Sequence, residues 1–177
     1  MGPAAPGELL QAPAPHPQAG VKLARRHDEH LDGRTWFRVL EDRPLRYAIE
    51  IRNDTFVSEE FIALLRKHAI ALVAADTVEW PLLMDITADF VYCRLHGSEQ
   101  LYVSGYDREA IDRWARRVVQ WSRGGEVENG RKASSANAKI ARARDVYVYF
   151  DNDAKVKAPF DALELRKCVA AMQREDA

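Results

Sequence analysis

The sequence has few cysteines, no long apolar run and almost no net charge, and each of these absences excludes a class of protein. No apolar segment reaches the roughly 18–20 residues needed to span a bilayer, and residues 1–20 lack the early basic residue and apolar stretch of a secretory signal. The formal net charge of −1 over 177 residues gives no electrostatic reason to expect nucleic acid or a membrane as a partner. We therefore expect a cytoplasmic protein.

The two cysteines of the chain fit that expectation. Cys93 and Cys168 both lie among apolar neighbours, which is typical of buried and unreactive thiols. Disulfides are rare in the cytosol, so we expect both thiols to be free.

Composition divides the chain into three parts. Residues 1–20 contain five of the eight prolines and bury too little apolar surface to become ordered, so we expect a disordered segment or the remnant of a loop. Residues 21–177 form the predicted globular domain. Within it, residues 124–144 are rich in Gly, Ala, Ser, Asn, Lys and Arg without periodicity, which indicates a flexible insertion.

Strand and helix patterns alternate along the domain. Ser58 is a suitable N-cap for one helix and Asp107 for another, in which apolar residues recur with the helical period of 3.6. Alternation of this kind predicts an α/β protein with a parallel sheet covered by helices. The predicted strands are Tyr47–Ile51, Ile70–Ala75, Phe90–Leu95 and Val146–Phe150, and the predicted helices are Ser58–His68, Asp107–Ser122 and Ala158–Gln173.

The two faces of the strands differ in polarity near their carboxyl ends. Side chains alternate across a strand, so Cys93 and Leu95 share one face while Arg94 and His96 share the other. A doubly wound sheet has helices on both faces and should be apolar on both. A closed barrel, whose inner face opens at a mouth, explains the polar face better, although flavodoxin-like sheets also place polar residues just past strand ends.

Four stretches carry a family resemblance, with Arg-Leu-His-Gly at 94–97 and the aromatic-Asp-Asn run at 150–152 as their most specific elements. The stretches are RYAIEIRNDTF, ALVAADTVEWPLLMDITADFVYCRLHG, YVSGYDREAIDRWARRV and DVYVYFDNDAKVKAPFDALEL. In order and spacing, residues 22–172 resemble the C-terminal part of the YecE-like family, domain of unknown function 72. The resemblance implies TIM-barrel-type βα units, about half a barrel with four parallel strands.

The chain departs from the family pattern in two respects. It lacks the family's first Gly-Trp-aromatic strand and the further strands that carry Glu, Asn, Tyr and Lys, whereas a complete barrel needs about 250 residues. The family often has Asn-Asn after the last strand, where this chain has Asp151 and Asn152. Closure of the sheet would therefore need self-association or a separate N-terminal half-barrel partner.

Polar residues follow the strand ends, which meet at one mouth if the barrel closes. We expect an anionic ligand group between the guanidinium groups of Arg52 and Arg94, proton transfer by His96, and orientation of the arginines by Glu50. The candidate catalytic residues are His96, Glu50 and Asp76, and the candidate substrate-binding residues are Arg52, Arg94, Asp151 and Asn152.

Other interpretations of these residues stay open. Glu50, Asp76 and His96 could hold Mg, Mn or Zn, but their spacing does not require a metal, and we predict neither a metal nor a cofactor. The arginines and Glu50 could instead form a structural ion-pair network. The predicted function is an enzyme acting on a small polar or anionic substrate by acid–base chemistry. The alternatives are a non-catalytic ligand- or protein-binding module and an inactive truncated gene product.

Overall fold

The structure, a computed structural model, describes residues 14–97, 105–138, 143–152 and 156–175. Contacts divide the chain into two compact units, residues 1–47 and residues 48–177, which are described separately below.

Residues 14–47, the described part of the first unit, contain one short helix and one 3₁₀ turn. Helix α2 spans Pro17–Ala24, and the 3₁₀ turn spans Glu29–Leu31. Proline suits the first turn of a helix because that position needs no N–H. The helix therefore begins inside the segment predicted to be disordered, whose residues 1–13 lie outside the described residues.

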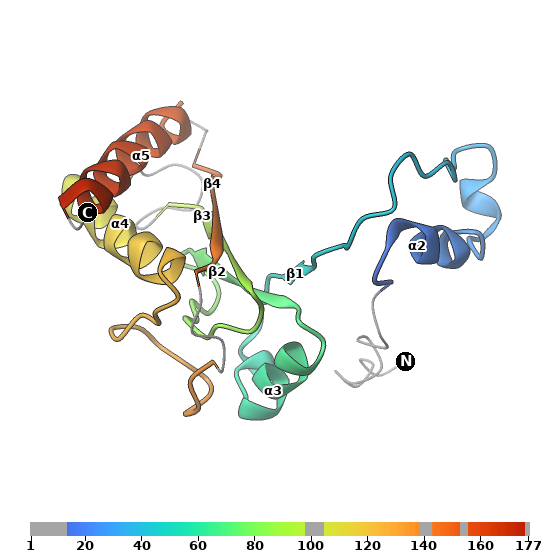
Figure 1. Ribbon diagram of the computed structural model, residues 1–177, viewed down its shortest axis with the longest axis horizontal. Helices are drawn as coiled ribbons and strands as arrows, with labels where there is room; N and C mark the ends of the chain where they lie inside the picture. The colour runs from blue at the N-terminus through green and yellow to red at the C-terminus, as the bar shows by residue number, and fades with distance from the viewer. Residues whose placement is uncertain (1–13, 98–104, 139–142, 153–155, 176–177) are drawn as a thin grey trace. The chain divides into compact units, whose positions relative to one another are not determined.

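The second unit is built on a parallel sheet of four strands in the order β1-β2-β3-β4 (Figure 1). Neighbouring strands in space are also neighbours in sequence, as repeated βα units require. The described strands form an unclosed sheet, so the α/β class and the four parallel strands are confirmed. The strands are β1 Ala48–Ile49, β2 Ala71–Asp76, β3 Phe90–Leu95 and β4 Asp145–Phe150.

The described residues of this unit form three α-helices, and the caps predicted from the sequence begin two of them. The Ser58 hydroxyl accepts a hydrogen bond from the Phe61 N–H at 3.2 Å, and the Asp107 carboxylate accepts one from the Ala110 N–H at 2.7 Å. Each cap satisfies a backbone N–H that has no partner inside the helix. A 3₁₀ turn, Asp54–Phe56, precedes α3 Glu59–Lys67, and the later helices are α4 Arg108–Ser122 and α5 Ala158–Glu175.

The connection between β2 and β3 contains no helix. Residues 77–89 form neither helix nor strand, with bends at 78–80 and 88–89, and most of residues 81–88 are buried. The Thr87 hydroxyl donates to the Ile70 carbonyl and accepts from the Leu72 N–H, both at 2.7 Å, which fastens this segment to the start of β2. A largely buried segment without helix thus joins β2 to β3, whereas two parallel strands are usually connected by a helix.

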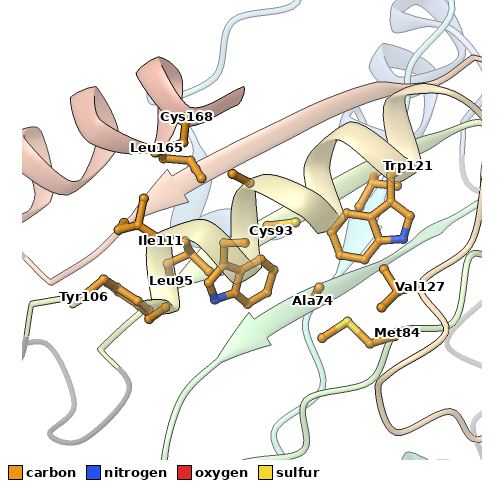
Figure 2. Packing of buried hydrophobic residues seen from close by; sticks show 14 of the residues in the cluster. Ala74, Met84, Cys93, Leu95, Tyr106, Ile111, Trp121, Val127, Leu165 and Cys168 are labelled. Carbon is orange, nitrogen blue, oxygen red and sulfur yellow. The ribbon is translucent and has the colours of Figure 1, made fainter. Parts of the chain in front are cut away.

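Helices α4 and α5 lie side by side against one face of the sheet (Figure 1). Between them and the strands lies the main core, in which Trp114 and Trp121 of α4 are 2% and 0% exposed. Cys93 and Leu95 point from β3 into this core (Figure 2), as their alternation with Arg94 and His96 predicts. On α5, Leu165 is buried in this core whereas Ala162 is exposed.

Part of the predicted flexible insertion is held by hydrogen bonds. Residues 124–138 contain no helix or strand. The Asp85 carboxylate nevertheless accepts hydrogen bonds from the N–H groups of Ala133 and Ser134, at 2.8 and 3.0 Å. Residues 139–142 lie outside the described residues, and the flexibility of the insertion stays a prediction.

Both cysteines are buried free thiols, as expected. No helix of the described residues has the length and apolar character needed to cross a membrane.

Candidate functional site

Four charged or titratable side chains meet on the sheet face opposite helices α4 and α5. Arg94 and His96 lie on or just after β3, while Glu50 follows β1 and Asp151 follows β4. Together with Arg52 they form a group that we call the carboxyl-end cluster, because each member lies at or beyond the carboxyl end of a strand. The sequence predicted all five as site residues, and the structure brings them together.

Arg94 is the centre of the cluster. Its Nη1 atom lies 2.8 Å from Oε2 of Glu50, and its Nη2 atom donates to Oδ2 of Asp151. Both terminal nitrogens of the guanidinium group are thus bonded to carboxylates that come from different strands. Charge-assisted hydrogen bonds of this kind are stronger than neutral ones and tie β1, β3 and β4 together.

The imidazole of His96 lies between the same two carboxylates. Its Nε2 atom is 3.3 Å from Oε2 of Glu50, and its Nδ1 atom is 3.4 Å from Oδ2 of Asp151. The side chain is fully buried. An imidazolium donates from both nitrogens, whereas a neutral imidazole donates from only one, so loss of one proton from the imidazolium removes the donor that faces one of the two carboxylates.

The Glu50 carboxylate occupies the position between Arg52 and Arg94 that we expected for the anionic group of a ligand. Its Oε1 atom accepts from Nε of Arg52 at 2.9 Å, while Oε2 accepts from Arg94. An anion that bridges the two arginines must therefore displace Glu50. The Arg52 side chain is 59% exposed, so it offers the accessible positive charge of the cluster.

Trp80 is a member of this region that sequence reasoning missed. Its ring packs edge-on against His96, with centroids 5.6 Å apart, and the Arg52 guanidinium lies 4.7 Å from its centroid on the ring face. The residue belongs to the helix-free connection after β2, where no periodic pattern indicates which way a side chain points. A tryptophan four residues after a strand end is the one signal that could have suggested it.

Two shifted pKa values describe the electrostatics of the cluster. Burial opposes ionisation of Glu50, but the hydrogen bond from Arg52 and the charge of Arg94 outweigh it and hold the pKa of Glu50 below its ordinary value of 4.5. Burial alone would lower the pKa of Arg94, but the bonds and charges of Asp151 and Glu50 raise it. Both groups therefore carry their charge at neutral pH.

Two predicted site residues lie elsewhere. The Asp76 carboxylate accepts a hydrogen bond from the indole N–H of Trp114 at 2.9 Å, and Asp76 pairs in register with Leu95, on the helix-covered face of the sheet. The Asn152 amide donates to the Asp161 carboxylate of α5 at 2.7 Å, and Asn152 is fully buried. Both residues link strand ends to helices and stand apart from the carboxyl-end cluster.

Of the three residues considered for a metal site, Glu50 and His96 meet, but Asp76 lies on the other face of the sheet. Across the described ranges, no group of three or more His, Cys, Asp or Glu side chains is arranged to hold a metal ion.

A second buried polar group lies near the amino ends of the strands, and we call it the amino-end cluster: Arg66, Asp85 and Ser134. Asp85 is 4% exposed. Arg66 donates to the Ile86 and Ala136 carbonyls at 3.1 and 3.0 Å and to the Ser134 hydroxyl at 3.2 Å. These bonds fasten the loop of residues 133–136 to α3 and to the helix-free connection. The amino end of a barrel is the end associated with stability.

Four parallel strands alternating with helices, with charged residues gathered at the carboxyl strand ends, define an α/β protein with an unclosed parallel sheet. The chain belongs to the family described as protein of unknown function DUF72, whose model matches residues 22–176. The resemblance to the YecE-like family is thereby confirmed.

Two solved structures of DUF72 family proteins resemble this fold. The protein from Thermotoga maritima MSB8 is 26% identical with a TM-score of 0.57, and the match covers 72% of this chain and 47% of that one. The protein from Enterococcus faecalis V583 is 19% identical with a TM-score of 0.52, over 71% and 48% of the two chains, and this likeness shows the fold alone. The chain thus spans about half the length of these relatives. No curated protein matches it.

Proposed function

We propose that the carboxyl-end cluster is part of an active site at the mouth of a TIM-type barrel, where His96 moves a proton to or from a small polar or anionic substrate. The observation that carries this proposal is the position of His96, fully buried, with each ring nitrogen 3.3–3.4 Å from a different carboxylate. Carboxylates placed on both sides of an imidazole are suited to orient it and to stabilise its charged form.

Arg52 would receive the substrate. It is the most exposed charge of the cluster, and the face of Trp80 holds its guanidinium in place. An anionic group that binds Arg52 would also replace Glu50 as a hydrogen-bond partner of Arg94. The released Glu50 carboxylate would then remain beside His96 and accept its proton or orient the ring. Acid–base chemistry would follow from this exchange of partners.

One observation favours a non-catalytic alternative. Arg94 already has a carboxylate on each terminal nitrogen, which is the bonding expected of a structural ion-pair network. In that case the mouth of the barrel would bind a ligand or a protein without turning anything over. The two functions differ in whether His96 is needed after a ligand has bound.

Titration calorimetry with inorganic phosphate tests the binding step on the full chain. We expect Arg52→Met to weaken phosphate binding about tenfold or more, since a charge-assisted hydrogen bond contributes roughly 1.5–3 kcal/mol. Arg113→Met is the matched control, because Arg113 is an exposed arginine of α4 outside the cluster. Equal binding by both variants would contradict the assignment of Arg52.

His96→Gln and Arg94→Met separate a role in ligand binding from a purely structural role. Each variant is measured for phosphate binding and for its free energy of unfolding. If both variants lose stability and still bind phosphate as tightly as the wild type, the carboxyl-end cluster is structural and the proposed active site is wrong.

A further inference from the structure

The outer edge of β4 presents backbone groups for pairing. The N–H of Asp151 bonds to the Leu95 carbonyl of β3 at 2.9 Å. Successive residues of a strand direct their N–H and C=O groups to opposite sides. The backbone groups of Val146, Val148 and Phe150 therefore point away from β3. Within the described part of the chain, β4 has a neighbouring strand on one side only.

The side chains along this edge are also incompletely covered. On the face of the carboxyl-end cluster, Tyr147 and Tyr149 are 37% and 50% exposed. On the helix-covered face, β4 and α5 line a groove of mixed polarity, to which Val148 and Val169 contribute apolar side chains and Arg166 a charged one. Partly exposed aromatic and aliphatic side chains on both faces of an edge strand are typical of an interface.

We propose that a second copy of this chain pairs with β4 through its own β1, and that the two copies together close an eight-stranded parallel barrel. The β4 edge and the β1 edge lie at opposite ends of the sheet order, and each copy supplies one of each. A single two-fold axis along the barrel then satisfies both edges at once. Four strands from each copy give the eight of a closed βα barrel.

Side-chain sizes at the two edges complement each other. Glu50 lies on the face of the carboxyl-end cluster, so alternation places Ala48 of β1 on that face as well. Ala48 is small and exposed, whereas the adjacent position on β4 of the other copy would carry an exposed tyrosine. Large and small side chains alternate in well-packed barrel interiors. On the other face, the half-buried Ile49 of the second copy would pack against the valine side chains of that groove.

The length of the relatives is consistent with this assembly, since the chain matches 47–49% of each solved DUF72 chain. Two copies would bring two carboxyl-end clusters to one mouth. The proposal rests on the edges of the sheet and not on acid–base chemistry, so it stands or falls independently of the proposed function.

Sedimentation equilibrium of the full chain tests the proposal. We expect a discrete dimer of twice the 20.1 kDa chain mass at micromolar concentration. A stable monomer, or a ladder of larger species without a discrete dimer, would overturn it, because an open edge that does not close pairs indefinitely.

A pair of variants at Val148 then locates the interface. Val148→Pro removes an N–H that points away from β3, so the ladder between β3 and β4 loses no bond, and proline is tolerated on such an edge. We expect it to raise the dimer dissociation constant about 100-fold or more, whereas Val148→Ala, which keeps the N–H, stays dimeric. A dimer that survives Val148→Pro has its interface elsewhere.

Circular dichroism checks that Val148→Pro is folded. If it is not, Tyr147→Lys takes its place, since Tyr147 is partly exposed on the face that would meet Ala48 of the second copy. A folded Tyr147→Lys variant should be monomeric because closure would bury its charge. An unchanged dimer would rule out pairing of β4 with β1.

Discussion

The two ends of the sheet each contain a polar cluster, and the clusters differ in what their charged groups bind. In the amino-end cluster, among the described residues, Asp85 accepts from the backbone N–H groups of the loop, and Arg66 donates chiefly to backbone carbonyls. In the carboxyl-end cluster, the charged groups bind one another, as Arg94 does with Glu50 and Asp151. Bonds to backbone fix the path of the chain, whereas bonds among side chains can exchange partners when a ligand arrives.

The largest effect is expected at the amino end. Asp85→Asn leaves two buried backbone N–H groups facing an amide that cannot accept from both as the carboxylate does. We expect a loss of about 2–4 kcal/mol in the free energy of unfolding, measured by urea denaturation. Glu128→Gln, an exposed change on the same loop, should cost almost nothing. If Asp85→Asn lowers the free energy of unfolding no more than Glu128→Gln does, the amino-end cluster does not hold the fold as we infer.

A smaller and reversible effect is expected at the carboxyl end. Arg94→Met leaves Glu50 and Asp151 without their shared cation and should cost about 2 kcal/mol of unfolding free energy at pH 7. That figure lies below the roughly 3–5 kcal/mol of a fully buried pair because the Arg94 side chain is 31% exposed.

Adding Glu50→Gln to Arg94→Met should recover at least half of that loss, because the remaining carboxylate no longer faces a second negative charge. A double variant less stable than Arg94→Met would mean that the cluster does not behave as exchangeable charge pairs.

The smallest effect concerns acid stability. The pKa of Glu50 is lowered in the folded chain, so its stabilising contribution is complete above the ordinary value of 4.5 and is lost as the pH falls through the lowered value. Between about pH 5 and 3, the unfolding free energy of the wild type should therefore fall more steeply than that of Glu50→Gln, by about 1 kcal/mol or less. Parallel curves for the two proteins would exclude the lowered pKa.

Much of the fold could be predicted because its signals are local. The Ser58 and Asp107 caps and the alternation of Cys93 and Leu95 with Arg94 and His96 depend on residues close in sequence. The same alternation placed the carboxyl-end cluster, since strand ends of a parallel sheet meet at one edge.

The amino-end cluster could not be predicted, because Asp85 meets its partners 48 and 49 residues further along the chain, in a loop without periodicity. The face of Asp76 was ambiguous because small alanines precede it on both faces of β2. Trp80 was missed for the related reason that it lies in a connection without helix or strand.

The central claim is that the carboxyl-end cluster receives a ligand while the amino-end cluster only holds the fold. A phosphate titration of the ¹⁵N-labelled chain, followed through arginine Nε–H and histidine ring resonances, tests it most directly. We expect saturable chemical-shift changes for Arg52, Arg94 and His96 and none for Arg66. Shifts of equal size at Arg66, or none at Arg52, Arg94 and His96, would contradict it.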